Sequence, residues 1–161
     1  MGVQQAERGI ALLRIVVGFW VLRSALSHLV WTPWPWAQVY WVQVATTELA
    51  QHALDHPTFW VRYLVQQALL PHAEAYVGTT VVLELLAGVS LTFGLLTVPG
   101  ALLALMLSLA GGILTHYRGD LALGYHLIVA AAALVFLVTR AGRRWGFDSF
   151  LSGMKNRALL W

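Results

Sequence analysis

VVLELLAGVSLTFGLLT (residues 81–97) is a long apolar run that carries one carboxylate, Glu84. A helix that spans a membrane needs about 20 mainly apolar residues. Four segments of the chain meet this requirement, at residues 9–30, 75–97, 99–117 and 121–139. The sequence therefore predicts an all-α membrane protein. Its predicted architecture is a four-transmembrane-helix antiparallel bundle that forms one integral membrane domain over residues 1–161.

The composition supports a chain whose surface faces lipid. Hydrophobic residues make up 59% of the 161 residues and charged residues only 11%, whereas soluble domains carry about 25% charged residues. The mean hydropathy is +0.70. The chain has no cysteine, which excludes disulfides, thiolate–metal sites and iron–sulfur ligation by its own side chains.

The charge distribution predicts the orientation in the membrane. An even number of spans places both termini on one side. Five of the ten basic residues lie in the tail at 140–161, and Arg8 precedes the first span. The opposite side carries Arg62 and Arg118. Because basic residues favour the cytoplasmic side, both termini are expected in the cytoplasm, and the loop at 31–74 is expected to face outward.

The outward-facing loop is expected to contain short interfacial helices. It begins with WTPWPW (residues 31–36), and tryptophan favours the membrane interface. Residues 37–54 and 58–70 could each form a short amphipathic helix, separated by Asp55, His56 and Pro57. Two interpretations stay open. The loop is either an anchor in the interface or a lid over a lateral opening for a lipid-soluble ligand.

Ionisable residues inside membrane spans are usually paired or functional. Arg23 lies on the order of 10 Å below the outer end of its helix, and Glu84 lies on the order of 14 Å below its own. Their similar depth and opposite charge predict an ion pair. Three histidines are expected in the same outer half: His28, His116 and His126. Arg14 is expected near the cytoplasmic interface, where its long side chain would reach water.

Small residues recur every four positions in the third predicted helix, at Gly100, Ala104, Ser108 and Gly112, and the series ends at His116. Such a stripe lets two helices approach closely. The loop histidines His52, His56 and His72 could be ordinary exposed residues. His52 and His56 have the i, i+4 spacing of metal ligands, but no third ligand completes a motif. The sequence shows no haem, flavin or metal site, and no basic stripe for nucleic acid.

Several motifs resemble those of DoxX-type membrane proteins. LLRIVVGFW (residues 12–20) is similar to the start of the first helix in that family, with Arg14 and Gly18 matching. The spacing of Glu84, Gly88, Gly94 and Thr97 is similar to the family's second-helix signature, and His116 also fits. The chain departs from the family pattern in three ways. It has His28 where the family often has lysine, and it lacks the basic residue that is common after the position of Thr97. Its first loop is also longer.

The resemblance implies a four-helix bundle in the cytoplasmic (inner) membrane of a prokaryote. Some relatives, the DoxD type, form part of thiosulfate:quinone oxidoreductase together with a second subunit. The first hypothesis is therefore a subunit of a quinone-linked redox or respiratory electron-transfer complex. Glu84 and His116 would bind the quinone head group or transfer protons, Arg23 would hold Glu84, and His28 or His126 would act as a relay.

A second hypothesis is a non-catalytic accessory subunit that packs onto a larger respiratory or photosynthetic complex in the bilayer. The absence of cofactor motifs and the small-residue stripes suit this role. A transporter is the weaker third hypothesis, because the four predicted helices show neither an inverted repeat nor a broken helix. The substrate, the electron donor and the question whether the chain is itself an enzyme stay open at the level of sequence.

Overall fold

The computed structural model describes residues 2–30, 46–52, 54–143 and 145–152, and their side chains except at 2–3, 27–30, 143 and 150–152. Every regular element in these ranges is helical. Four helical segments are long and apolar enough to cross a membrane, Gln4–Leu26, Phe59–Phe93, Thr97–Arg118 and Asp120–Thr139. The predictions of an all-α chain and of four membrane-spanning helices are therefore confirmed at the level of helix length and composition.

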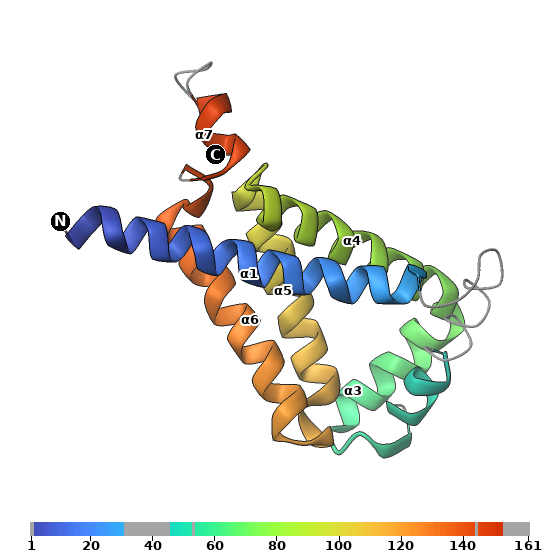
Figure 1. The fold of residues 1–161 in the computed structure, drawn as a ribbon. Coiled ribbons are helices and arrows are strands. Elements are labelled where there is room, and N and C mark those ends of the chain that lie inside the picture. The colour runs from blue at the N-terminus through green and yellow to red at the C-terminus, as the bar shows by residue number, and fades with distance from the viewer. Residues whose placement is uncertain (1, 31–45, 53, 144, 153–161) are drawn as a thin grey trace.

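Helices α1 (Gly2–Val30) and α4 (Ala73–Phe93) pack along each other as the first pair (Figure 1). Two glycines allow the close contact, one from each helix. A Cβ atom on Gly18 would overlap the backbone nitrogen of Thr92, and a Cβ atom on Gly88 would lie 2.6 Å from the Cα atom of Leu22. Because the opposing atoms belong to the backbone, no side chain can move aside to make room.

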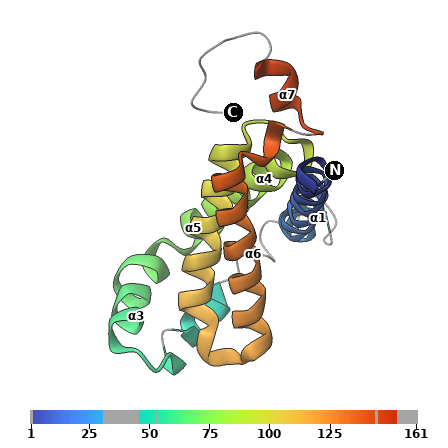
Figure 2. The same ribbon diagram turned by 90° about the vertical axis from the view of Figure 1, so that its left-hand side faces the viewer.

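Helices α5 (Thr97–Thr115) and α6 (Asp120–Thr139) form the second pair, joined by a 3-10 turn at His116–Arg118. The stripe of small residues on α5 is buried, at Gly100, Ala104, Ser108 and Gly112. Figures 1 and 2 show that the two pairs cross. They meet where α4 turns into α5, a region called the termini end below, and diverge toward the loop end, where α5 turns into α6.

Helix α4 ends four residues earlier than the predicted end at 97. Gly94 adopts a left-handed backbone conformation, with φ of 64°, and closes α4 at Phe93. The amide of Leu95 then donates to the carbonyl oxygen of Ser90 at 3.0 Å, which satisfies one of the last carbonyl groups of the helix. Pro99 lies in the first turn of α5, where its missing N–H is tolerated.

The predicted second loop helix at 58–70 is not a separate element. Helix α3 (Phe59–Leu64) continues through a π turn, Val65–Leu69, and a 3-10 turn, Leu70–His72, directly into α4. Pro71 lacks an N–H and disfavours a regular α-helix at this point, so the helix bends. Residues 46–52 and 54–55 are helical. The WTPWPW motif at 31–36 and the rest of the predicted helix at 37–54 lie outside the described residues.

Hydrophobic packing forms two separate cores. The main core joins both helix pairs and includes Val17, Leu91, Ala133 and Phe136. A smaller core at the loop end joins Leu49 and Val65 to Ala73, and Leu114 at the end of α5 packs against it. The segment around α3 therefore bridges the diverging ends of the two pairs, and it places the loop histidines beside the end of α5.

Candidate functional site

A groove between α5 and α6 brings together two of the predicted site residues. His116 follows the last turn of α5, His126 comes from α6, and both line a space of about 250 Å³. The other walls are mainly apolar, and the exposed side chains Leu109, Ile113 and Leu127 contribute to them. In a membrane these three side chains would face lipid, so the groove would be open to an apolar ligand from the side.

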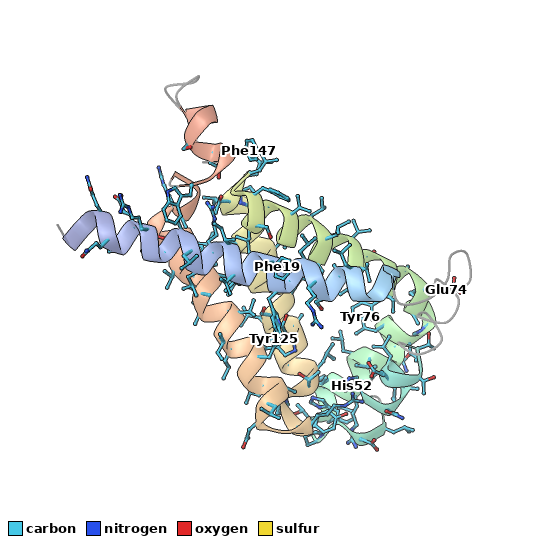
Figure 3. All side chains as sticks on the ribbon, viewed as in Figure 1. Phe19, His52, Glu74, Tyr76, Tyr125 and Phe147 are labelled. Atoms are coloured by element: carbon cyan, nitrogen blue, oxygen red, sulfur yellow. The ribbon has the colours of Figure 1, made fainter. Side chains whose placement is uncertain are left out.

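A smaller cavity lies beside His126. It has a volume of about 30 Å³, and its polar lining comes from Glu84 of α4, Ser108 of α5, and Tyr125 and His126 of α6. Ser108 and His126 line both spaces. His126 therefore lines both the groove and the cavity that Glu84 also lines. Figure 3 shows Tyr125 in the middle of the molecule, between the two helix pairs.

Gly111 provides the space for the His126 ring. A Cβ atom on Gly111 would overlap the Cε1 atom of the imidazole, whereas a Cβ atom on Gly112 would lie 3.4 Å from the Cβ atom of His126, which is an ordinary contact. The Nδ1 atom of His126 is buried, and it has no hydrogen-bond partner among the described residues. The ring is thus held close to the α5 backbone, with one polar atom turned away from the surface.

The described residues place Arg23 and Glu84 in different surroundings. Arg23 is exposed, and its guanidinium carbon lies 5.6 Å from the centre of the Trp20 ring, within cation–π range. Glu84 is half-buried near the middle of α4 and faces the inner cavity. The ion pair between Arg23 and Glu84 stays a prediction. The side chain of His28 lies outside the described residues, so its role stays a prediction as well.

The loop-end histidine cluster comprises His52, His56, His116 and Tyr117. His56 is fully buried, and its Nδ1 atom accepts a hydrogen bond of 3.1 Å from the Thr58 amide. Its Nε2 atom must then carry the proton, which it donates to the carbonyl oxygen of Ile113 at 3.0 Å. Both nitrogens of a neutral imidazole are therefore used, and the loop is attached to the last turn of α5.

His116 and His52 complete the histidine cluster. The Nδ1 atom of His116 lies 2.9 Å from the same Ile113 carbonyl oxygen, and its ring centre lies 5.0 Å from that of His56. The Nδ1 atom of His52 lies 3.0 Å from the hydroxyl oxygen of Tyr117. Burial lowers the pKa of His52. Arg118 and His56 lower this pKa further, and Asp55 opposes them.

The interpretation of His52 and His56 as ordinary exposed residues is wrong, because both are buried against the end of α5. The sequence did contain one signal that the two histidines act together. Their four-residue spacing places both side chains on one helical face. The sequence did not reveal what that face contacts, because Ile113 and Tyr117 lie about 60 positions later. Among the described residues, no group of three histidine, aspartate or glutamate side chains is placed to hold a metal ion.

The expectation that Arg14 reaches water is also wrong. Arg14 is fully buried, and its guanidinium donates hydrogen bonds of 2.9 Å to the carbonyl oxygens of Ala141 and Trp145. The chain after α6 folds back over α1 and covers the side chain. A Cβ atom on Gly94 or on Gly146 would crowd the guanidinium, so both glycines are needed to admit it.

Asp148 is a second buried charge at the termini end, which the sequence did not single out. It lies in α7 (Phe147–Ser152), and its carboxylate accepts hydrogen bonds from the amides of Leu96 at 2.7 Å and Thr97 at 2.8 Å. Its own amide donates to the carbonyl oxygen of Gly94 at 2.8 Å. A carboxylate is favoured at the N-terminus of a helix, so Asp148 caps α5. Arg14, Asp148 and residues 94–97 are called the C-terminal clasp below.

Comparison of the chain with protein-family models, with curated proteins and with solved structures finds no match. The function is therefore argued from the site. The clasp consists of buried groups that hydrogen-bond to the backbone, which is the pattern of a structural device. The groove and the inner cavity, in contrast, are lined by residues that carry imidazole, hydroxyl and carboxylate groups.

Proposed function

We propose that this chain is a membrane subunit that binds a quinone head group in the groove between α5 and α6. The observation that carries the proposal is the position of His126, which lines both an apolar groove and a cavity that contains a carboxylate. A quinone ring has two carbonyl oxygens that accept hydrogen bonds, and these oxygens take up two protons on reduction. In this proposal His126 supplies both a hydrogen bond and a proton to these oxygens.

The groove suits a single aromatic ring with an apolar tail. Its volume of about 250 Å³ is close to the lower end of the range for small-molecule sites, roughly 300–1,000 Å³. The Nδ1 atom of His116 donates to the Ile113 carbonyl oxygen. The Nε2 atom of the neutral ring therefore carries no proton, and it would accept a hydrogen bond from a hydroxyl group of the reduced ring. A tail would leave between Leu109, Ile113 and Leu127 into the lipid.

The protons and the electrons have separate sources in this proposal. Protons would pass between the ring oxygens and Glu84 by way of His126. The chain has no cysteine, and the proposal assigns the two electrons to a partner redox subunit that carries its own cofactor. The resemblance to DoxX-type proteins supports this assignment, because DoxD-type relatives work with a second subunit in thiosulfate:quinone oxidoreductase.

The remaining predictions belong to the same proposal. With the termini end in the cytoplasm of a prokaryote, α1, α4, α5 and α6 would cross the inner membrane in alternating directions. The groove would then lie in the outer half of the bilayer. Arg23 would hold Glu84 electrostatically, and His28 would extend the relay from α1.

Quinone binding by the purified chain in lipid nanodiscs tests the proposal. A short-tailed benzoquinone is titrated, and quenching of tryptophan fluorescence gives the affinity. His126→Phe should weaken binding about tenfold or more, which corresponds to the loss of one hydrogen bond. His72→Phe is the matched control, because His72 is exposed and lies outside the groove. Equal affinity of wild type and His126→Phe would refute the proposed site.

The accessory-subunit hypothesis has one observation in its favour. Helix α3 exposes three aromatic side chains, Phe59, Trp60 and Tyr63, at 60%, 74% and 54% of their surface. Such a surface suits either the membrane interface or a partner protein. Mild extraction followed by native mass spectrometry would distinguish the two roles. A larger stable complex combined with no quinone binding would favour the accessory role.

A further inference from the structure

We infer that the cavity between Glu84, Ser108, Tyr125 and His126 holds an ordered water molecule that joins His126 to Glu84. The proposed function gives this water its role in proton transfer, whereas the presence of the water rests on the cavity alone. A protein cavity holds water when it is large enough for one molecule and offers two to four polar partners. The cavity beside His126 meets both conditions.

The size of the cavity fits one water molecule. Its volume is about 30 Å³, which exceeds the minimum of roughly 10–15 Å³ for one water. The same volume is far too small for a quinone ring. The cavity would therefore hold water and the groove would hold the quinone ring, although Ser108 and His126 line both spaces.

The polar groups around the cavity also fit a water molecule. A carboxylate from α4, a hydroxyl from α5, and a phenol and an imidazole from α6 converge on it. The Nδ1 atom of His126 is buried and has no hydrogen-bond partner among the described residues. A buried polar atom without a partner is costly, and a water molecule in the adjoining cavity would supply one.

This water completes a path for protons from the groove to the middle of α4. A carboxylic acid at Glu84 would give its proton to the water, and the water would give one of its own to Nδ1 of His126. The imidazole would release its Nε2 proton to the ring oxygen in the groove. His126 and the water would end neutral, and Glu84 would become a carboxylate. The path would run in reverse when the ring is oxidised, and Glu84 would regain its proton.

Water-edited solid-state NMR on the quinone-free protein in lipid bilayers tests this inference. The imidazoles are labelled with nitrogen-15, and the signal of His126 is assigned by its loss in His126→Phe. Magnetisation transferred from water to Nδ1 of His126 is compared with transfer to backbone amides in the centre of α5. In wild type, Nδ1 should receive magnetisation sooner than those amides.

Two variants fill the cavity without reaching the groove. Val129 and Ala104 line the cavity only, so Val129→Ile and Ala104→Val should each displace the water. Transfer to Nδ1 should then fall to the level of the reference amides. Ala110→Val is the control on α5, because Ala110 is exposed and lines neither space. It should leave the transfer unchanged.

The outcome does not depend on quinone binding. If Nδ1 receives no more magnetisation from water than the reference amides in wild type, the water site does not exist. Transfer that persists in both folded cavity-filling variants would also overturn it, because the water would then come from the groove. A positive result with no quinone affinity would keep the water site and remove the proposed function.

Discussion

The Arg14 guanidinium donates a hydrogen bond of 2.9 Å to the carbonyl oxygen of Ala141, 127 positions further along the chain. This bond ties the first helix to the segment that follows the last spanning helix. The same segment carries Asp148 to the N-terminus of α5. The termini end is therefore fixed by polar contacts, while the two helix pairs diverge toward the loop end, where the groove lies.

Replacing Arg14 by methionine should destabilise the fold. The change removes two hydrogen bonds to carbonyl oxygens and a positive charge whose attraction acts on the buried carboxylate of Asp148. Loss of one partner from such a buried arrangement costs about 3 kcal/mol. Thermal unfolding in detergent measures the effect. Arg8→Met is the control, because Arg8 is exposed on the same helix, and it should leave the unfolding temperature nearly unchanged.

Asp148 should contribute as a helix cap. Asp148→Ala removes the acceptor of two backbone amides, and the loss of a cap costs about 1 kcal/mol or more. Asp148→Asn keeps one acceptor oxygen and should cost less. The same thermal unfolding experiment on Asp120→Ala provides the comparison, because Asp120 is exposed at the start of α6. An equal effect of Asp148→Ala and Asp120→Ala would argue against the cap.

Gly18 should be essential for the packing of α1 on α4. A methyl group on Gly18 would overlap backbone atoms of Leu91 and Thr92, which cannot move aside. Overpacking of this kind costs about 1–3 kcal/mol, so Gly18→Ala should lower the unfolding temperature. Gly9→Ala on the same helix meets no atom within 4 Å and should be neutral or slightly stabilising. Comparable stability of the two variants would mean that the helices do not approach as described.

Replacing Gly111 by alanine should affect quinone binding rather than the stability of the fold. A methyl group there would displace the imidazole of His126, whereas one on Gly112 would make an ordinary contact. Because an imidazole can rotate away, Gly111→Ala should change the unfolding temperature little. It should weaken quinone binding about as much as His126→Phe, roughly tenfold. Fluorescence titration of Gly111→Ala and Gly124→Ala tests this. Gly124→Ala should bind like wild type, because a Cβ atom on Gly124 meets no atom within 4 Å and Gly124 does not line the groove.

The histidine cluster should loosen in acid. Burial lowers the pKa of His52 below its usual value of 6.5, so the unfolded chain binds a proton more readily than the folded chain does. The contribution of His52 to stability is therefore complete above pH 6.5 and declines as the pH falls below it. The charged or titratable groups around it are Asp55, His56, Tyr117 and Arg118.

Amide exchange of residues 46–52 between about pH 8 and pH 5 measures this loosening, after correction for the intrinsic pH dependence of exchange. Protection should decrease below pH 6.5. His52→Gln should flatten the dependence, and His72→Gln should not, because His72 is exposed and outside the cluster. A pH profile that is the same in wild type and His52→Gln would show that another group controls the loop.

Local sequence patterns were sufficient to predict the positions of the long helices. The apolar runs predicted the four long helices to within a few residues, apart from α1, which begins at Gly2. The small-residue stripe on α5 also required no tertiary information, since a four-residue repeat on a helix lies on one face. Gly94 ended α4 earlier than predicted, because an apolar run does not reveal a left-handed residue within it.

The sequence alone determined that this chain is helical and has four helices fit for a membrane, because helix length and hydropathy are properties of consecutive residues. Tertiary structure decided which charged and polar residues are buried. Arg14, His56 and Asp148 depend on partners that lie 51 to 131 positions away in the sequence. Their burial is favourable only when distant parts of the chain supply backbone groups that hydrogen-bond to them. A local sequence pattern does not show which distant segments will do so.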